Sequence, residues 1–257
     1  MHLMYSTAND KPITRNQLAM IPTPQSRGRF HRPYPFDTYV EDVHDALDRV
    51  DIEAVGEEYA VTKDHQRMFG VMEIQPKVHE GEYISKLDWK LLLGLRGAHD
   101  QSIGRGLVIG SQVLVCSNLC FSGNVADFKT KQTTFIASRL PGLIRDAVMQ
   151  IPAMAERQEK VYDRYKDCQV RDRWGDAALV EMFRQDGLSS AQLGRAINEW
   201  HEPTFKEHAD LGWNAWRLMN AATQALKPTG ANFNANLMAQ RSQVVSNVVD
   251  SVARIDF

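Results

Sequence analysis

The sequence predicts an α+β fold, with an antiparallel sheet in the N-terminal half packed by helices and a helical C-terminal half. Between 58 and 120 apolar residues tend to alternate with polar ones, whereas after about 136 they recur every three or four residues. Strand patterns therefore come first and helix patterns second, which is the order of an α+β protein. We expect three regions: an extended N-terminal arm at 1–36, an α+β sheet domain at 37–150, and a helical region at 151–257 that packs on it.

The composition is that of an ordinary soluble globular protein, with 43% hydrophobic and 24% charged residues in a chain of 257. The net charge of −2 argues against indiscriminate coating of DNA, but it leaves room for a local basic face. The opening MHLMYSTANDKP lacks the pattern of a signal peptide, and no run reaches the roughly 18 apolar residues of a membrane helix. Cys116, Cys120 and Cys168 form an odd set, so we expect a reduced protein in the cytoplasm.

The arm ends in SRGRFHRPYPF, where basic residues interleave with aromatic ones. The basic residues suit phosphate contact and the aromatic ones base stacking. They are Arg27, Arg29, His31 and Arg32, interleaved with Phe30, Tyr34 and Phe36. The alternative, which we favour, is an extended arm whose prolines block a helix and whose aromatic rings attach it to the body of the protein.

Four patterns predict the elements of the sheet domain. TYVEDVHDALDRVDIEAVGEEY is typical of an amphipathic helix, with Asp37 or Thr38 as its N-cap. YAVTKDHQRMFGVMEI predicts a β-hairpin with its turn at 63–66. EYISKLDWKLLLGLR predicts a strand with one core face and one wet, partly basic face. GLVIGSQVLVC is apolar on both faces and predicts a more central strand.

Helix signals dominate the rest of the chain. Leu140-Pro141 predicts a break or a helix start. Gly187 is expected to cap one helix at its C-terminus, and Ser189 or Ser190 to cap the next at its N-terminus. A further helix carries Trp213 and Trp216 in an apolar stripe and stops at Pro228-Thr229-Gly230. The side chains expected in the core are Leu87, Trp89, Leu91, Leu93, Val113, Val115, Cys116, Trp216 and Leu218.

The adjacent pair His99-Asp100 lies between two predicted strands. Such a pair could orient an imidazole for base chemistry or for a metal. Neighbours on a turn seldom hydrogen-bond each other in that geometry, so we favour a structural connection in which Asp100 and Ser102 cap backbone amides.

Cys116 and Cys120 could bind zinc only if ligands such as His99 and Cys168 completed the set, and their spacing does not indicate this. A nucleophilic Cys116 is disfavoured because a strand cysteine gains no helix N-terminus to lower its pKa. No GxSxG, Walker or HExxH motif is present. We therefore predict no catalytic residue, no metal and no cofactor.

A local excess of cations suggests a binding face. Between 61 and 140, Lys and Arg outnumber Asp and Glu by ten to seven, while residues 1–60 show the opposite balance, six to ten. Such a face could follow a phosphate backbone, or it could simply be a solvated sheet surface. The residues predicted to cluster on or near one sheet face are Lys86, Lys90, Arg96, Arg105, Lys129 and Lys131.

The stretch RGAHDQSIGRGLVIGSQVLVCSNLCFSG resembles the signature of a phage- and plasmid-borne family, domain of unknown function 932. That signature is roughly an Arg-Asn-Ser-His-Asp loop, a strand, and a Val-Cys-X-Asn turn leading to Phe-Ser-Gly; here Gly-Ala replaces Asn-Ser. RMFGVMEI and NEWHEP…WNAWRLMNAAT are also similar to the family, so the resemblance spans about 37 to 250. It implies a mobile element, most simply a bacteriophage, and a structural role for His99, Asp100, Cys116, Asn118, Phe121 and Gly123.

Three functions remain open from the sequence. The first is a non-enzymatic nucleic-acid-handling protein, a homo-oligomer of the single-strand binding or annealing type with single-stranded DNA as its partner. The second is a phage accessory protein that binds and inhibits or redirects a host defence or transcription protein, through the acidic helix at 38–58 or the Trp-rich helix. The third, which we disfavour, is an enzyme centred on His99, Asp100 and Cys116. No membrane partner is expected.

Overall fold

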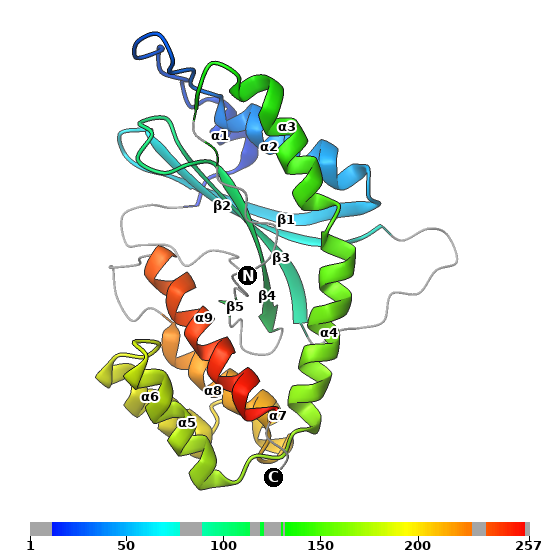
Figure 1. The fold of residues 1–257 in the computed structure, drawn as a ribbon, viewed down its shortest axis with the longest axis vertical. Helices are drawn as coiled ribbons and strands as arrows, with labels where there is room; N and C mark the ends of the chain where they lie inside the picture. The colour runs from blue at the N-terminus through cyan, green and yellow to red at the C-terminus, as the bar shows by residue number, and fades with distance from the viewer. Residues whose placement is uncertain are drawn as a thin grey trace. The chain divides into compact units, whose positions relative to one another are not determined.

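The computed structural model describes residues 12–77, 89–113, 119–120, 130, 132–227 and 235–254 (Figure 1). The chain divides into two compact units. One comprises 1–110, 124–152 and 230–233, and the other comprises 111–123, 153–229 and 234–257. The strands are β1 (Ile52–Val61), β2 (Arg67–Pro76), β3 (Trp89–Ala98), β4 (Gly106–Val113) and β5 (Leu119–Cys120). The helices are α1 (Arg15–Ala19), α2 (Phe36–Asp48), α3 (Ile136–Val148), α4 (Ile151–Asp167), α5 (Asp172–Arg184), α6 (Ser190–His201), α7 (Lys206–Asp210), α8 (Ala215–Leu226) and α9 (Ala235–Val252).

The α+β prediction is confirmed. The strands form one sheet in the order β1-β2-β3-β4-β5, followed by helices in the second half of the chain. β1 and β2 form the predicted hairpin, with Val61 opposite Met68 and the Arg67 carbonyl accepting the Thr62 amide at 3.0 Å. Its turn places His65 at a φ of 56°, so the reversal falls within the predicted 63–66 segment.

The predicted wet face of β3 is wrong in the middle of the strand. Leu92, on the supposedly solvated side, is fully buried, as are Leu93 and Leu95 on the other side. β3 is an interior strand between β2 and β4, and strands buried on both faces read as continuous apolar runs, as LLLGL does here.

The arm is not wholly extended. Thr14 begins the short helix α1 with a capping box, in which its hydroxyl accepts the Gln17 amide and the Gln17 side chain accepts the Thr14 amide. Ile13 forms a β-bridge with Tyr59, so this part of the arm extends the pairing of β1. The following helix, α2, has Pro35 as its N-cap and starts just before the predicted Asp37 or Thr38. The prediction that this helix continues to about 58 is wrong, because α2 ends at Asp48 and Ile52–Val61 forms β1.

α2 and α3 supply the helical layer of the first unit, where they pack against each other. α2 buries an apolar stripe that includes Tyr39 and Val43, and α3 buries Leu140 and Ile144. The break expected at Leu140-Pro141 is wrong, because Pro141 lies inside α3 and the chain interrupts only at 149–150.

The second unit holds most of α4, the helices α5 to α9, the end of β4, and β5. Ser189 caps α6 as predicted, in a capping box with Gln192. The Gly187 prediction is wrong in detail. Asp186 adopts the left-handed conformation, with φ of 61°, while the Gly187 amide donates to the Met182 carbonyl at 2.8 Å in a Schellman pattern.

The expected core can be scored for five of its nine members. Trp89, Leu93, Trp216 and Leu218 are buried, and Leu91 is only half-buried. Those outside the described residues or side chains are Leu87, Val113, Val115 and Cys116.

Two helix glycines give a matched test of packing in the second unit. A Cβ on Gly175 in α5 would overlap with the Trp200 indole, whereas a Cβ on Gly194 in α6 meets nothing within 4 Å. We expect Gly175→Ala to lower the free energy of unfolding by about 1–3 kcal/mol or more through overpacking. Gly194→Ala should raise it by roughly 0.5–1 kcal/mol, since alanine is the better helix former. Urea titration checks both values, and equal effects would contradict the packing.

Candidate functional site

The His99-Asp100 pair is a structural connection. The Asp100 carboxylate accepts the Ser102 amide at 2.9 Å and pairs with Arg67 at 3.2 Å, so it turns to groups other than the neighbouring imidazole. The His99 backbone is held as well, with its amide 2.7 Å from the Gln66 carbonyl. The predicted capping role of Asp100 is confirmed.

The His99 imidazole lies in the core of the first unit. It is 1% exposed and stacks on Phe36 with 4.0 Å between ring centroids. Burial, assisted by the positive charge of Arg105, lowers the pKa of His99 to about 4. The ring is therefore neutral at physiological pH, with a pKa too low for a general base working near neutrality.

Arg105 does not belong to a solvated basic face, so the prediction that it contacts phosphate there is wrong. Its side chain is fully buried, and its guanidinium lies 5.1 Å from the ring centroid of Phe36 and 5.0 Å from that of Tyr39. One Nη donates to the carbonyl of Tyr34, whose ring centroid is 5.7 Å away. The cation is stabilised by aromatic faces.

Of the other predicted cations the structure describes Lys90 and Arg96, and both are half-buried. Lys90 is paired with Glu73 at 2.7 Å. Lys86, Lys129 and Lys131 lie outside the described residues. The described part of the chain thus gives no support to a phosphate track along the sheet.

The cysteine positions add no described site. Cys116, Asn118, Phe121 and Gly123 lie outside the described residues, and the side chain of Cys120 is not described. Cys168 is half-buried and forms no disulfide bond within the described part of the chain. Within the described ranges, no three His, Cys, Asp or Glu side chains come together as a metal site would need.

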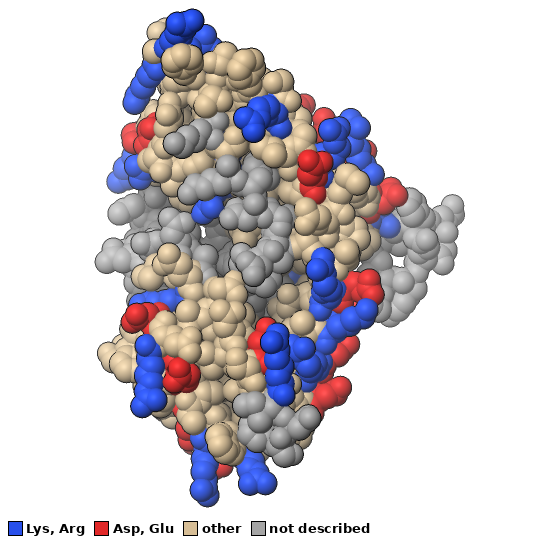
Figure 2. All heavy atoms as spheres, in the orientation of Figure 1, with Lys and Arg blue, Asp and Glu red and all other residues tan. Residues whose placement is uncertain are grey.

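The N-terminal arm exposes cations together with an aromatic ring, the combination that was expected of a nucleic-acid-binding surface. Three cations of the arm, Arg27, Arg29 and Arg32, are all exposed, and Phe30 between them exposes 69% of its surface. Figure 2 shows basic side chains at the edge of the molecule where the N-terminal segment lies in Figure 1. We call these four residues, together with Phe135 and Arg139, the arm surface.

His31 holds the arm in place. Its ring is 3% exposed; Nδ1 accepts the Arg27 amide at 3.0 Å and Nε2 donates to the His99 carbonyl at 2.9 Å. The Arg32 amide donates to the Gln132 carbonyl at 3.3 Å, and the Tyr34 amide to the Gln132 side chain at 2.8 Å. These bonds bring the arm beside the segment that leads into α3.

That segment contributes Phe135, with 68% of its surface exposed, and the exposed Arg139 one helical turn later. Sequence reasoning identified the arm pattern but missed both residues. The sequence did offer a signal for Phe135, because this phenylalanine ends the segment KTKQTTF and follows two lysines closely, as in the basic and aromatic pattern of the arm.

The two sequence segments that contribute the arm surface contain cations and no acids. Residues 11–36 contain Lys11, Arg15, Arg27, Arg29 and Arg32, and no Asp or Glu. Residues 128–145 contain Lys129, Lys131, Arg139 and Arg145, again with no acid. In the described part of the chain, no carboxylate forms an ion pair with the four cations of the arm surface. The Arg32 guanidinium donates to the His31 carbonyl at 3.2 Å and that of Arg29 lies 5.6 Å from the Phe30 ring centroid, so these cations are held by neutral groups of the arm itself.

Comparison with models of known families, with curated proteins and with solved structures gives no match. The resemblance of the 96–123 motif therefore stays a prediction. Among the helices that the structure describes, none combines the length and the apolar character needed to cross a membrane.

Buried His99 makes stability depend on pH. The unfolded chain takes up a proton near pH 6.5, whereas the folded protein resists protonation of His99 until about pH 4. The unfolded state thus binds more protons between these values, and the free energy of unfolding falls as pH drops through this window, by at most about 3 kcal/mol from this residue.

His99→Gln should make the free energy of unfolding less dependent on pH between pH 7.5 and pH 4.5, as measured by urea unfolding. This holds whatever stability the substitution costs at neutral pH. His65→Asn, at an exposed turn position, is the matched control and should keep the wild-type slope. Parallel curves for His99→Gln and wild type would contradict the assignment.

Arg105 is expected to matter for stability. Arg105→Ala removes the contacts to three aromatic rings and to the Tyr34 carbonyl, and it leaves a cavity in the first unit. We expect a loss of about 2–4 kcal/mol in the free energy of unfolding, measured in urea. Arg32→Ala, at an exposed position, should stay within about 0.5 kcal/mol of wild type. Similar costs for the two variants would show that Arg105 is not buried as described.

Proposed function

We propose that this protein is a non-enzymatic, phage-encoded nucleic-acid-handling protein that binds single-stranded DNA or RNA through the arm surface. The observation that carries the proposal is the pairing of exposed, unpaired guanidinium groups with two exposed phenylalanine rings, Phe30 and Phe135. Single-strand binders use this combination, in which cations follow the phosphates and aromatic rings stack on unpaired bases.

The chemistry also limits what is recognised. Phosphate contacts position a strand without reading its sequence, and every base offers a face on which a phenyl ring can stack. We therefore expect little sequence preference and a preference for single strands over duplex, because bases in a duplex are already stacked. The mobile-element setting implied by the motif resemblance fits this role.

The Trp-rich surface considered for a host protein is not open. Trp216 is 2% exposed and packs on Tyr162 with 4.5 Å between centroids, while Trp213 is covered by the Arg217 guanidinium at 4.2 Å. Trp216 belongs to the core of the second unit, and Trp213 is half-buried. Of the two surfaces considered for a host protein, the acidic face of α2 remains.

Charge removal on the arm surface gives the first test. Anisotropy of a labelled single strand of about 40 bases, measured at about 50 and 200 mM salt, should show salt-sensitive binding by the wild type. The variant Arg27→Ala/Arg29→Ala/Arg32→Ala should bind much more weakly and flatten the plot of log K against log salt by about 2, since each lost phosphate contact removes roughly 0.7 from the slope.

Two comparisons sharpen this test. Phe30→Ala/Phe135→Ala keeps every charge, so affinity should fall by about 1–3 kcal/mol per lost stack at an unchanged salt slope. Arg157→Ala/Arg195→Ala/Lys206→Ala removes three cations from the second unit and should leave binding close to wild type. Equal losses from the two triple variants, or no wild-type binding at low salt, would overturn the proposed function.

A further inference from the structure

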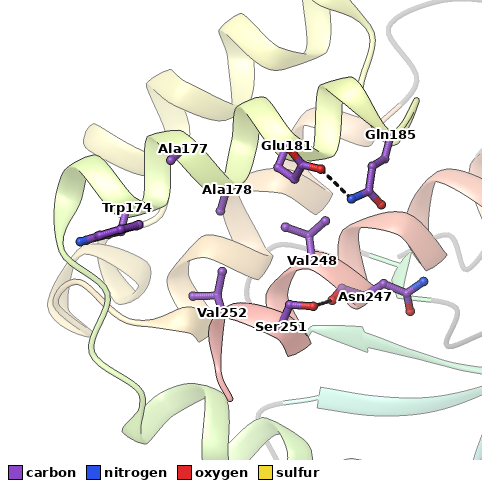
Figure 3. A pocket seen from close by; sticks show the side chains of 9 residues that line it. All are labelled: Trp174, Ala177, Ala178, Glu181, Gln185, Asn247, Val248, Ser251 and Val252. Carbon is purple, nitrogen blue, oxygen red and sulfur yellow. Dashed lines mark hydrogen bonds between the residues drawn. The ribbon is translucent and has the colours of Figure 1, made fainter. Parts of the chain in front are cut away.

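The second unit carries a groove between α5 and α9 (Figure 3). Its volume is about 230 Å³, below the roughly 300–1,000 Å³ of typical small-molecule sites, so side chains of another helix suit it better than a ligand. Ala178 and Val248, each 6% exposed, lie deep between the two helices, and Ser251 adds another small side chain from α9. Small side chains thus line the groove, which lets another helix approach it closely.

A protruding ring stands at one end of this groove. Trp174 lines it and still exposes 51% of its surface, which is unusual for the largest side chain in the protein (Figure 3). A two-fold contact buries the same patch on both partners, so it requires a patch that is complementary to itself. A patch that offers both an exposed indole and a hollow lined by small residues meets that requirement.

The charges on α5 favour an antiparallel arrangement of this helix in two copies of the chain. Arg173, Ala177 and Glu181 follow one i, i+4, i+8 row, so each charge lies about 6 Å along the helix from Ala177, on opposite sides. In an antiparallel contact centred on Ala177, Arg173 of each copy faces Glu181 of the other. A parallel arrangement would instead bring like charges together.

Both charges have capacity left for this pairing. Arg173 is exposed and has no ion pair among the residues that the structure describes. Glu181 accepts one hydrogen bond from Gln185 at 2.9 Å and has Arg184 at 3.8 Å, which leaves acceptor sites on its carboxylate.

We propose that the α5–α9 groove is the contact surface between two copies of this chain, joined by an antiparallel α5–α5 crossing with its two-fold axis near Ala177. Each copy places Trp174 against the other's groove, and two Arg173–Glu181 pairs flank the axis. The surface lies wholly in the second unit and the evidence for it is independent of the arm surface, so either proposal can fail without the other.

A charge swap tests the pairing. Light scattering and sedimentation across concentrations up to about 100 µM should show a wild-type dimer, an ordinary range for weak association. Arg173→Glu and Glu181→Arg should each raise the dimer Kd by tenfold or more, because each reversal sets two like-charge contacts across the axis. The double variant Arg173→Glu/Glu181→Arg should recover dimerisation, and Arg157→Glu on α4 should have no effect.

Cross-linking tests the position of the axis. Under mild oxidation, Ala177→Cys should form a covalent dimer far faster than Ala153→Cys, an exposed control on α4, because only residues near the axis meet their own copy. A monomeric wild type, a double variant that fails to recover although folded, or equal cross-linking of the two cysteine variants would overturn the proposal. Capture of a different protein by a groove that shows no self-association would overturn it too.

Discussion

The architecture of the first unit depends on one buried cation. Arg105 touches the arm through the Tyr34 carbonyl, α2 through the ring of Tyr39, and β3 at Gly97, where a Cβ would come within 3.0 Å of its Nη1. Burial lowers the pKa of Arg105 to about 10, so it stays charged at neutral pH. Aromatic faces and a carbonyl dipole compensate that charge, and no carboxylate forms an ion pair with it in the described part of the chain.

The arm surface follows from this anchor. Arg105 holds the arm at the Tyr34 carbonyl. The His31 ring accepts the amide of Arg27, four residues earlier in the arm, and donates to the His99 carbonyl in the core. The residues between these fixed points, Arg29 and Phe30 among them, have little room to collapse onto the core. When a single-stranded nucleic acid binds a loop that is already ordered, less conformational entropy of the protein is lost. A small number of contacts can then give a higher affinity.

Local patterns predicted the α+β order, the hairpin and the Ser189 cap, because alternation, turn residues and capping boxes are properties of neighbouring residues. They could not predict that Leu92 and Arg105 are buried, since that depends on what covers the sheet. The same limit applies to the site. The interleaved Arg and Phe of the arm were visible in the sequence, whereas Phe135 joins them only because Gln132 pairs with Arg32 and Tyr34 across about 100 residues of chain.

Near-neutral net charge and nucleic-acid binding are compatible when cations are concentrated locally. Residues 11–36 and 128–145 together hold nine Lys and Arg and no acid, so the surplus of acids lies elsewhere, much of it on α2. Under the proposed function one subunit would contact only a few phosphates, and its affinity at physiological salt would be modest. Self-association through the second unit would join two such surfaces in one particle. If one strand spans both, the second contact becomes intramolecular and adds affinity without new chemistry. The length of the nucleic acid thus separates the two roles. The affinity for a single strand too short to span both arm surfaces depends on the arm surface alone, whereas the affinity for a long one depends also on dimerisation through the α5–α9 groove.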